Sequence, residues 1–295
     1  MGQGENGHLL RILGVAFGVA AIIGGTIGQG ILRAPGLIAT HVQQGWLILL
    51  LWAGFGALVF VDSMSTVELA ASIREAGGPY SFLHRAFGPL AGLVTGVADC
   101  FANIGSVAIL AVVFAEYLHR LGLLAGVPVG LLSLSLICVA WGVQALGTRV
   151  GGPSQEVGSA VKALVYGALI LALLLAPRGA PTPAPAVSPS VTLLGIAISL
   201  RAIAGTYQGW NGAAYFCEEM TDPRRSIVRA TFVGIALVTL VYVLANVAYL
   251  SVLTPAEMAG SNLVAADAAQ RLFGPRAELF VTAVSLVRSP PGSTW

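Results

Sequence analysis

The stretch Gly24-Gly25-Thr26-Ile27-Gly28-Gln29-Gly30 interrupts the first long hydrophobic segment of the chain near its middle. A second stretch, Gly205-Thr206-Tyr207-Gln208-Gly209-Trp210-Asn211, interrupts the sixth segment in the same way. In a bilayer, a helix leaves its i→i+4 hydrogen bonds unmade only where the freed N–H and C=O groups meet protein, water or a ligand. Two breaks that lie five segments apart and share a Gly-Thr…Gln-Gly pattern therefore predict the substrate site of a secondary transporter built from two related halves.

The composition is typical of a protein that crosses a membrane. Hydrophobic residues make up 56% of the chain and charged residues only 9%, with a mean hydropathy of +0.85, whereas about 25% of a soluble domain is charged. The charge-free stretches 121–148 and 230–256 exceed the ~20 residues that a helix needs to cross a bilayer core. We therefore predict an all-α integral membrane protein that passes through the lipid bilayer many times.

Seven full spans are expected from the hydrophobic segments. Their estimated bounds are 12–39, 46–72, 89–119, 129–147, 157–176, 192–218 and 227–253. Between them, 73–88 predicts a short amphipathic helix on the membrane surface, 177–190 a proline-rich extended loop, and 256–272 a short interfacial helix. An eighth apolar run, 278–287, stops at Arg288 after about half the length of a span. It is either a re-entrant or interfacial piece or, as we favour, the mark of a chain that is cut short or shifted out of frame.

The distribution of lysine and arginine predicts a cytoplasmic N-terminus in the inner or plasma membrane of the cell. With that orientation, eight cationic residues lie inside and four outside, which satisfies the positive-inside rule. The inner set is Arg11, Arg74, Arg85, Arg149, Lys162, Arg224, Arg225 and Arg229, and the outer set is Arg120, Arg178, Arg271 and Arg276.

No pattern in the sequence predicts a metal site, a cofactor or an enzyme active site. The four histidines are scattered through loops, and Cys100, Cys138 and Cys217 lie in apolar segments without ligand spacing. We expect these cysteines to be reduced and buried. A membrane acyl- or glycosyltransferase needs a His/Asp cluster or an acidic metal-binding motif at the membrane face, and the sequence shows neither. No nucleic-acid partner is indicated, and the oligomeric state stays open.

Several loop and helix motifs together carry a family resemblance. Ile27-Gly28-Gln29-Gly30-Ile31 with Pro35-Gly36 resembles the G-x-G-I…P signature in the first helix of amino acid permeases of the amino acid–polyamine–organocation superfamily. Glu68-Leu69, Gly77-Gly78-Pro79-Tyr80 and Phe87-Gly88-Pro89 resemble that family's second helix and the loop after it. The run from Tyr207 to Asn211, followed by Glu218-Glu219-Met220-Thr221-Asp222-Pro223-Arg224-Arg225, resembles its sixth helix and the next loop.

The resemblance implies about twelve spans, with helices one to five and six to ten forming inverted repeats. Residues 11–176 then correspond to the first repeat and 191–287 to an incomplete second repeat, with helices 1 and 6 broken and 288–295 as a tail. All of these parts belong to a single transmembrane domain, 1–295. The expected fold is thus a partial five-plus-five inverted-repeat transporter.

Backbone groups at the two breaks are the expected ligands of a free amino acid. The N–H groups around Gly28, Gln29 and Gly30 lie at the start of the outer half-helix. This end of the helix dipole is positive, so these groups are expected to bind an anion. Freed carbonyls on the other side of each break can accept hydrogen bonds from the ammonium. The alternative is that these glycines only pack helices closely. The predicted substrate-binding residues are Gly24, Gly25, Thr26, Gly28, Gln29, Gly30, Gly205, Thr206, Tyr207, Gly209 and Trp210.

Lys162, in the fifth segment, is the predicted coupling residue. An unpaired charge inside the membrane is costly, so an intramembrane lysine is a functional hypothesis by default. The resemblance implies that it occupies the region where sodium-coupled relatives bind a cation, between the first and eighth helices. The alternative is a side chain that snorkels to the cytoplasmic interface.

Arg33 and Arg201 are candidates for an outer vestibule or gate. Each lies about one turn from a break, on the outer side, where the repeats place the two half-helices side by side. They either draw an anionic substrate inward or pair with Asp99 or Glu116 of the third segment; a purely structural role is an equal alternative. The resemblance implies an aromatic lid at position 205, where this chain has glycine, and therefore a roomier or differently gated pocket.

The function that these features favour is secondary active transport of an amino acid by alternating access, coupled to protons or working by exchange. The alternative is a non-transporting structural or truncated fragment of such a permease.

Overall fold

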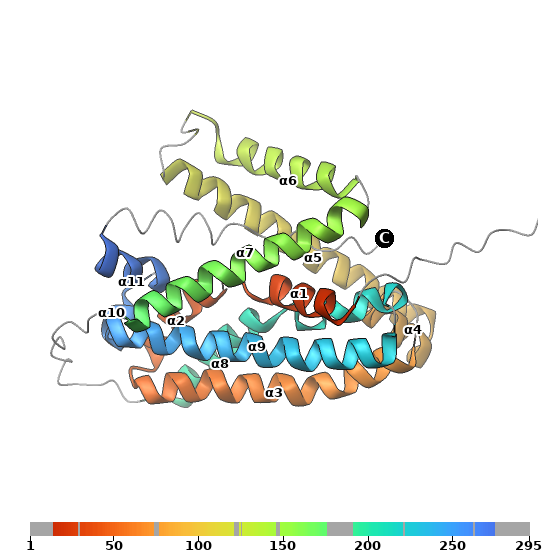
Figure 1. Ribbon diagram of the computed structural model, residues 1–295, viewed down its shortest axis with the longest axis horizontal. Helices are drawn as coiled ribbons and strands as arrows, with labels where there is room; N and C mark the ends of the chain where they lie inside the picture. The colour runs from red at the N-terminus through yellow and green to blue at the C-terminus, as the bar shows by residue number, and fades with distance from the viewer. Residues whose placement is uncertain are drawn as a thin grey trace, which may run out of the picture.

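The computed structural model describes residues 14–28, 30–73, 77–120, 124, 126–145, 148–175, 191–220, 222–261 and 263–274, apart from some side chains within the helices. Its elements are helical throughout this part (Figure 1). They are α1 (Val15–Thr26), α2 (Gly30–His41), α3 (Gly45–Ser72), α4 (Pro79–Phe87), α5 (Pro89–Arg120), α6 (Val129–Ala145), α7 (Thr148–Leu175), α8 (Leu193–Tyr207), the 3₁₀ helix η1 (Trp210–Glu219), α9 (Pro223–Val252), α10 (Pro255–Ala259) and α11 (Val264–Phe273).

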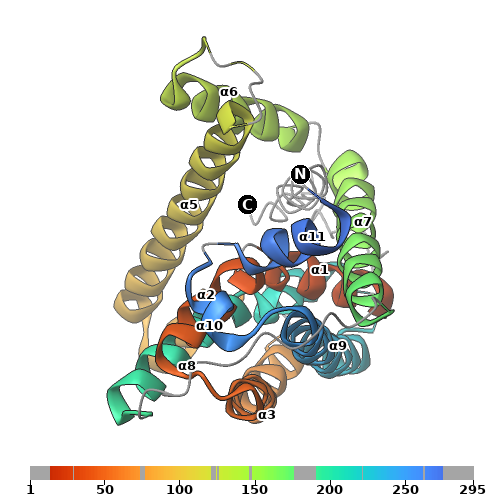
Figure 2. The same cartoon turned by 90° about the vertical axis from the view of Figure 1, so that its left-hand side faces the viewer.

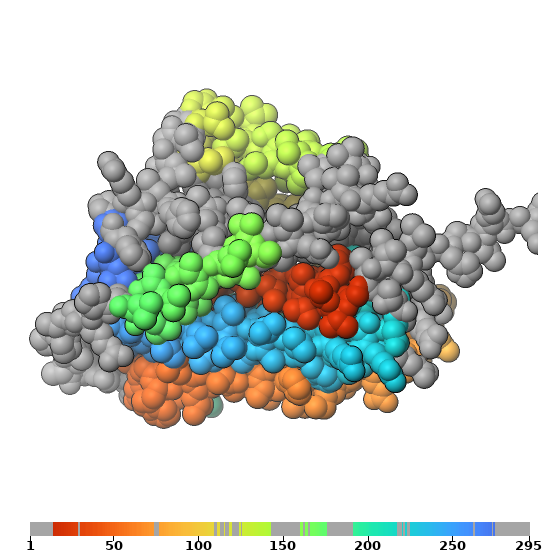
Figure 3. Space-filling view, viewed as in Figure 1, coloured from red at the N-terminus to blue at the C-terminus, as the bar shows by residue number. Residues whose placement is uncertain are grey.

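The long helices α3 and α9 form the base of a bundle. They run antiparallel, because Gly56 of α3 lies against Thr239 of α9 while Gly45 lies against Leu250. On the other side of α9 pack α1 and α7. On one face of the molecule, α7 and α1 lie side by side above α9, and α3 lies below it (Figure 3). This arrangement places the first helix at the centre of the fold, next to α9.

An aromatic cluster fills the middle of the bundle. The indole of Trp52 on α3 lies 5.2 Å, between ring centroids, from the ring of Tyr242 on α9 and 6.4 Å from that of Tyr207 on α8. Tyr207 also packs edge-on against Tyr242 at 5.1 Å. All three side chains are buried. These large rings therefore hold the end of α8, where the second glycine-rich stretch begins, against α3 and α9.

The helices α5 and α6 stand away from this bundle (Figure 2). They pack on each other, and α4 packs along the first turns of α5. The expectation that the cysteines are buried is wrong for Cys100 on α5 and Cys138 on α6, which are exposed free thiols. Both cysteines lie on helix faces that contact no other described helix. The apolar residues around them in the sequence do not distinguish such a face from a buried one. The side chain of Cys217 lies outside the described residues.

Three of the described helical segments are long and apolar enough to cross a membrane. They are Gly45–Ser72, Pro89–Ala108 and Arg225–Val252, and α1 with α2 adds a fourth if the bent pair is one span. The predicted segment 129–147 is present as α6, whose 17 residues cover about 25 Å. In α7, the apolar helical segment within the described residues is Tyr166–Leu175. The seven full spans therefore stay a prediction.

Two short helices occupy the region where one interfacial helix, 256–272, was predicted. They are α10 and α11, with Gly260 and Ser261 between them. The backbone of this turn lies directly on α2, since a Cβ added to Gly36 would overlap the carbonyl oxygen of Ser261. The chain bends there because it follows the surface of α2 rather than continuing as a single helix.

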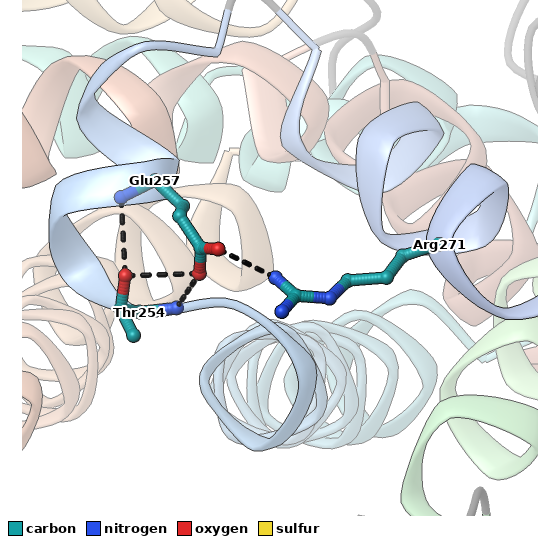
Figure 4. A network of polar contacts seen from close by, with 3 residues as sticks. All are labelled: Thr254, Glu257 and Arg271. Carbon is teal, nitrogen blue, oxygen red and sulfur yellow. Dashed lines mark hydrogen bonds and ion pairs between the residues drawn. The ribbon is translucent and has the colours of Figure 1, made fainter. Parts of the chain in front are cut away.

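A polar network joins α10 to α11 (Figure 4). The carboxylate of Glu257 accepts hydrogen bonds from the N–H of Thr254 at 2.7 Å and from its hydroxyl at 2.9 Å, while the N–H of Glu257 donates back to that hydroxyl at 3.3 Å. This reciprocal pair is a capping box. The other carboxylate oxygen lies 2.6 Å from Nη1 of Arg271.

These contacts predict a pH-dependent contribution to stability. The N–H of Thr254 and, after it, the guanidinium of Arg271 hold the pKa of Glu257 below its ordinary value. The contribution is therefore present above about pH 4.3, the pKa of a free glutamate, and is lost as the pH falls through the lowered pKa. Because the pair is partly exposed to solvent, we expect less than about 1 kcal/mol. Melting curves of the parent protein and of Glu257→Gln should differ at pH 7 and converge near pH 3; a constant difference would contradict this.

Candidate substrate site

Both glycine-rich stretches coincide with helix ends. The helix α1 ends at Thr26 and α2 begins at Gly30, and the two axes differ by 47°. In the same way α8 ends at Tyr207, and η1 begins at Trp210. Four helix ends thus come from two stretches of chain that are about 180 residues apart in the sequence.

Glycine at position 209 allows the two stretches to touch. Its φ of +103° lies in the left-handed region, which side chains other than glycine rarely adopt. A Cβ at this position would lie 2.7 Å from the carbonyl oxygen of Gly25 and 3.2 Å from the amide nitrogen of Thr26. The backbone of the second stretch therefore lies directly on the last turn of α1.

A second contact lies on the other side of the break. A Cβ added to Gly30, the first residue of α2, would lie 2.6 Å from Cγ2 and 3.1 Å from Cα of Thr206 near the end of α8. Further along the same two helices, Gly195 lies against His41. The helices α2 and α8 therefore run side by side and antiparallel, starting from the junction.

A single hydroxyl group joins the C-terminal ends of α1 and α8. The hydroxyl of Tyr242, which projects from α9, lies 2.8 Å from the carbonyl oxygen of Thr26 and 2.8 Å from that of Thr206. Helix C-termini leave their last carbonyls without intrahelical donors, and both of these residues are buried. One proton shared between two carbonyl oxygens thus serves both breaks.

Removing this hydroxyl should destabilise the fold. Tyr242→Phe leaves two buried carbonyl oxygens without their donor, so we expect a loss of about 1–3 kcal/mol in the free energy of unfolding. The control is Tyr249→Phe on the same helix, because the buried hydroxyl of Tyr249 has no partner among the described residues and its removal should be neutral or stabilising. Thermal melting of the two variants in detergent distinguishes them. Equal melting temperatures would show that the shared bond contributes nothing.

The helix ends at the junction carry opposite partial charges. The C-termini of α1 and α8 are the negative ends of their dipoles, whereas the N-terminus of α2 is positive. The hydroxyl oxygen of Thr26, buried at the same place, has no hydrogen-bond partner among the described residues. The junction therefore offers acceptors for a cationic group and, across the break, donors for an anionic one.

Open space adjoins the junction at two of the glycines. A Cβ on Gly28 or on Gly205 would have no described atom within 4 Å, apart from immediate chain neighbours. The carbonyl oxygen of Gly28 lies 3.5 Å from the hydroxyl of Tyr166 on α7. The predicted glycines therefore divide into two groups. Gly25, Gly30 and Gly209 make the contact between the stretches, and Gly28 and Gly205 border free volume.

The remaining predicted binding residues lie around this contact. The side chain of Thr206 bonds back to the carbonyl of Ile203 at 2.7 Å, and the ring of Tyr207 belongs to the aromatic core with its hydroxyl 3.2 Å from Thr239. Trp210 is half-buried at the start of η1, and Gly24 is buried in α1. Gln29 lies outside the described residues.

The predicted outer residues Arg33, Arg201 and Asp99 make no ion pair with one another among the described residues. Arg33 on α2 and Arg201 on α8 are both exposed, at similar heights along the antiparallel pair. Neither forms an ion pair among the described residues. Asp99 instead accepts a hydrogen bond from the hydroxyl of Tyr215 on η1, at 3.1 Å. The side chains of Glu116 and of Lys162 lie outside the described part of the molecule.

Tyr242 was not predicted from the sequence. A signal for it exists, because Tyr242, Asn246 and Tyr249 follow one another at helical spacing within an apolar segment, which puts polar groups on one face of α9. All three are buried. The partners of the Tyr242 hydroxyl cannot be read from the sequence, because they are backbone carbonyls on two other helices.

Comparison with known proteins gives consistent results. A family model described as amino acid permease matches residues 13–288. The b(0,+)-type amino acid transporter 1 of Mus musculus is 32% identical over 276 residues, which cover 90% of this chain and 56% of that protein. The large neutral amino acids transporter small subunit 2 of Homo sapiens is 30% identical over 300 residues, covering 97% of this chain and 56% of that protein. The chain thus spans about half the length of the curated relatives it matches.

Proposed function

Because the chain belongs to the amino acid permease family, we propose that it takes part in secondary active transport of amino acids by alternating access, with the substrate bound where α1, α2, α8 and η1 meet. The family and the relatives are transporters rather than enzymes. The apolar helices agree with a multi-pass membrane protein.

The proposal includes a partial five-plus-five inverted repeat. Residues 11–176 form the first repeat and 191–287 an incomplete second one, within one transmembrane domain, 1–295. In this arrangement α1 and α2 are the two halves of the broken first helix, and α8 and η1 those of the sixth. Support comes from the contacts between the two stretches, which pair Gly25 with Gly209 and Gly30 with Thr206.

The zwitterion of an amino acid matches the charges of the junction. Its carboxylate binds the N–H groups at the start of α2, beside the free volume at Gly28, and its ammonium binds the carbonyls at the ends of α1 and α8 together with the hydroxyl of Thr26. A charged group is costly to desolvate unless it is matched in this way. The substrate side chain points toward Gly205, where the open space accommodates bulky groups, and Arg33 and Arg201 attract anionic substrates from outside.

The observation that carries the proposal is the Tyr242 hydroxyl shared by the carbonyls of Thr26 and Thr206. The C-terminal ends of α1 and α8, far apart in the sequence, thus meet at one hydroxyl group inside an apolar bundle. The direct experiment is equilibrium binding of a panel of radiolabelled amino acids to the purified chain in nanodiscs. Saturable binding of at least one amino acid, displaced by unlabelled substrate, is expected. A chain that is folded and binds none of the panel would contradict the proposed site.

Uptake into proteoliposomes separates transport from the alternative function. Accumulation of the bound amino acid under a pH gradient indicates proton coupling, and uptake only into vesicles preloaded with amino acid indicates exchange. Binding without uptake under either condition would favour the alternative, a non-transporting fragment of a permease. The proposed location is the inner or plasma membrane with the N-terminus in the cytoplasm, as indicated by the arginines at the start of α9.

Lys162 is the proposed coupling residue, and its variant gives a separate prediction. It lies in α7 one turn before Tyr166, whose hydroxyl approaches the carbonyl of Gly28, so the helical period puts both positions on the face toward the first break. Lys162→Gln is expected to keep substrate affinity within about threefold but to lose pH-driven accumulation, because it removes a charge and keeps the side-chain length. Uptake measured at several external pH values tests this. An unchanged pH dependence would identify Lys162 as an interfacial residue.

A further inference from the structure

We propose that Tyr215 and Asp99 form a latch that docks the inner half of the sixth helix, η1, on the hairpin of α4 and α5, and that releasing it is the movement that opens the inner side. The latch consists of one hydrogen-bonding contact, in which the Tyr215 hydroxyl lies 3.1 and 3.2 Å from the two carboxylate oxygens of Asp99. The assignment of η1 as an inner half-helix rests on the proposed function. The latch itself does not.

The ring of Tyr215 packs against the backbone of the hairpin. The turn before α4 brings Gly78, with a φ of +51°, beneath the tyrosine ring, and a Cβ at this position would lie 3.2 Å from Cδ1 and Cε1 of that ring. The ring therefore lies on bare backbone, and its hydroxyl extends to α5. Any side chain at position 78 would displace the ring from this place.

Two further glycines hold the hairpin in the shape that presents Asp99. A Cβ on Gly92 would lie 2.6 Å from Cβ of His84, and one on Gly96 would lie 3.0 Å from the ring of Tyr80. Tyr80 and His84 stack on each other, with 5.7 Å between centroids and 8° between planes. The helices α4 and α5 thus approach closely along one face of each, and Asp99 follows on α5 one turn beyond Gly96.

The contact joins α5 to the inner end of the bundle. Among the described residues, α5 packs along α4 and α6 and not along the bundle helices, as the separation in Figure 2 also shows. The Tyr215–Asp99 contact is a side-chain hydrogen bond from α5 to the bundle. A hydrogen bond to a charged group is stronger than one between neutral groups, yet a single contact of this kind breaks and reforms readily.

The latch is also linked to the proposed substrate site. Asn211, the last residue of the second glycine-rich stretch, lies within hydrogen-bonding reach of the Tyr215 hydroxyl that also contacts Asp99. A movement of η1 that follows substrate binding at the break is therefore transmitted to the hydroxyl that holds the hairpin. Phe82 of α4 packs with Ala214 and Met220 in a separate apolar cluster, so the hairpin keeps an anchor when the latch opens.

Hydrogen exchange by mass spectrometry on the whole chain in nanodiscs tests the latch without substrate. Tyr215→Phe removes one oxygen atom, and Asp99→Asn keeps the volume and removes the charge. In either variant, peptides from 210–219 and 77–87 are expected to exchange at least about tenfold faster, the change expected when a hydrogen bond to a charged group is lost. Peptides from α3 should not change. The double variant should equal Tyr215→Phe, because that substitution already removes the donor of the one bond through which both act.

The control is Tyr80→Phe, which removes a tyrosine hydroxyl from the same hairpin and should leave exchange as in the parent. Unchanged exchange in both single variants, additive effects in the double variant, or the same increase in Tyr80→Phe would each overturn the proposal. If Tyr215→Phe does not fold, Asp99→Asn alone decides between these results.

A distance measurement tests the direction of the movement. Spin labels on the native Cys100 of α5 and on Val233→Cys of α9, in a background carrying Cys138→Ser and Cys217→Ser, report the separation of hairpin and bundle. Tyr215→Phe is expected to add a population at longer distance, and the same single distance in parent and variant would overturn the latch as an opening device. Because neither measurement needs substrate, a failure here is distinct from a failure to bind or transport amino acids.

Discussion

Gly209→Ala is expected to lower the free energy of unfolding by about 3 kcal/mol. Two costs combine. Alanine at a φ of +103° is strained by about 1–3 kcal/mol, and its Cβ would overlap the carbonyl group of Gly25 and the amide of Thr26. Those atoms belong to the backbone, so relief requires that α1 and η1 move apart, at a further cost of about 1–3 kcal/mol.

The matched control is Gly28→Ala, the same substitution in the other stretch. Its φ is not positive, and its Cβ would meet no described atom within 4 Å, so we expect a change below about 1 kcal/mol. Thermal melting in detergent should therefore show Gly209→Ala lower by roughly 5–10 °C and Gly28→Ala close to the parent. Similar melting temperatures for the two variants would mean that the stretches do not touch as the structure describes.

The membrane class and the positions of the helix ends follow from features that are local in the sequence. Long charge-free, apolar stretches predict membrane helices because polar groups are costly to place in lipid and a helix satisfies its own backbone groups. Glycine-rich stretches mark helix ends because they combine poor helix propensity with freedom of φ. Residues 24–30 and 205–211 could therefore be selected without knowledge of the fold.

What the sequence could not supply is which groups face each other across the fold. Position 205 and position 209 are both glycine, yet one borders open space and the other lies on the backbone of Gly25. A pair between Asp99 and an arginine was one of the alternatives that charge suggested, but the fold brings Tyr215 to Asp99. In both cases the deciding contact joins segments more than 100 residues apart, and residue type alone does not identify the partner.

Gly28→Val is expected to weaken amino acid binding at least about 100-fold while the protein remains folded. The open space beside Gly28 is the proposed place of the substrate carboxylate, and a valine side chain occupies it. The carboxylate then loses its charge-assisted hydrogen bonds to the N–H groups at the start of α2, each worth about 1.5–3 kcal/mol, and two orders of magnitude in affinity correspond to about 2.7 kcal/mol. Melting in the absence of amino acid should stay within a few degrees of the parent.

Gly54→Val provides the comparison, because Gly54 lies on the exposed face of α3 and a Cβ there also meets no described atom within 4 Å. Both variants add the same side chain to open space, but only Gly28 adjoins the junction. Equilibrium binding of the radiolabelled amino acid should therefore be lost in Gly28→Val and retained in Gly54→Val. If Gly28→Val binds with the affinity of the parent, the space beside Gly28 does not hold the substrate, and the glycines of the first stretch only allow close packing. If binding and melting temperature fall together, the variant has disrupted the junction itself, and the carboxylate must be located elsewhere.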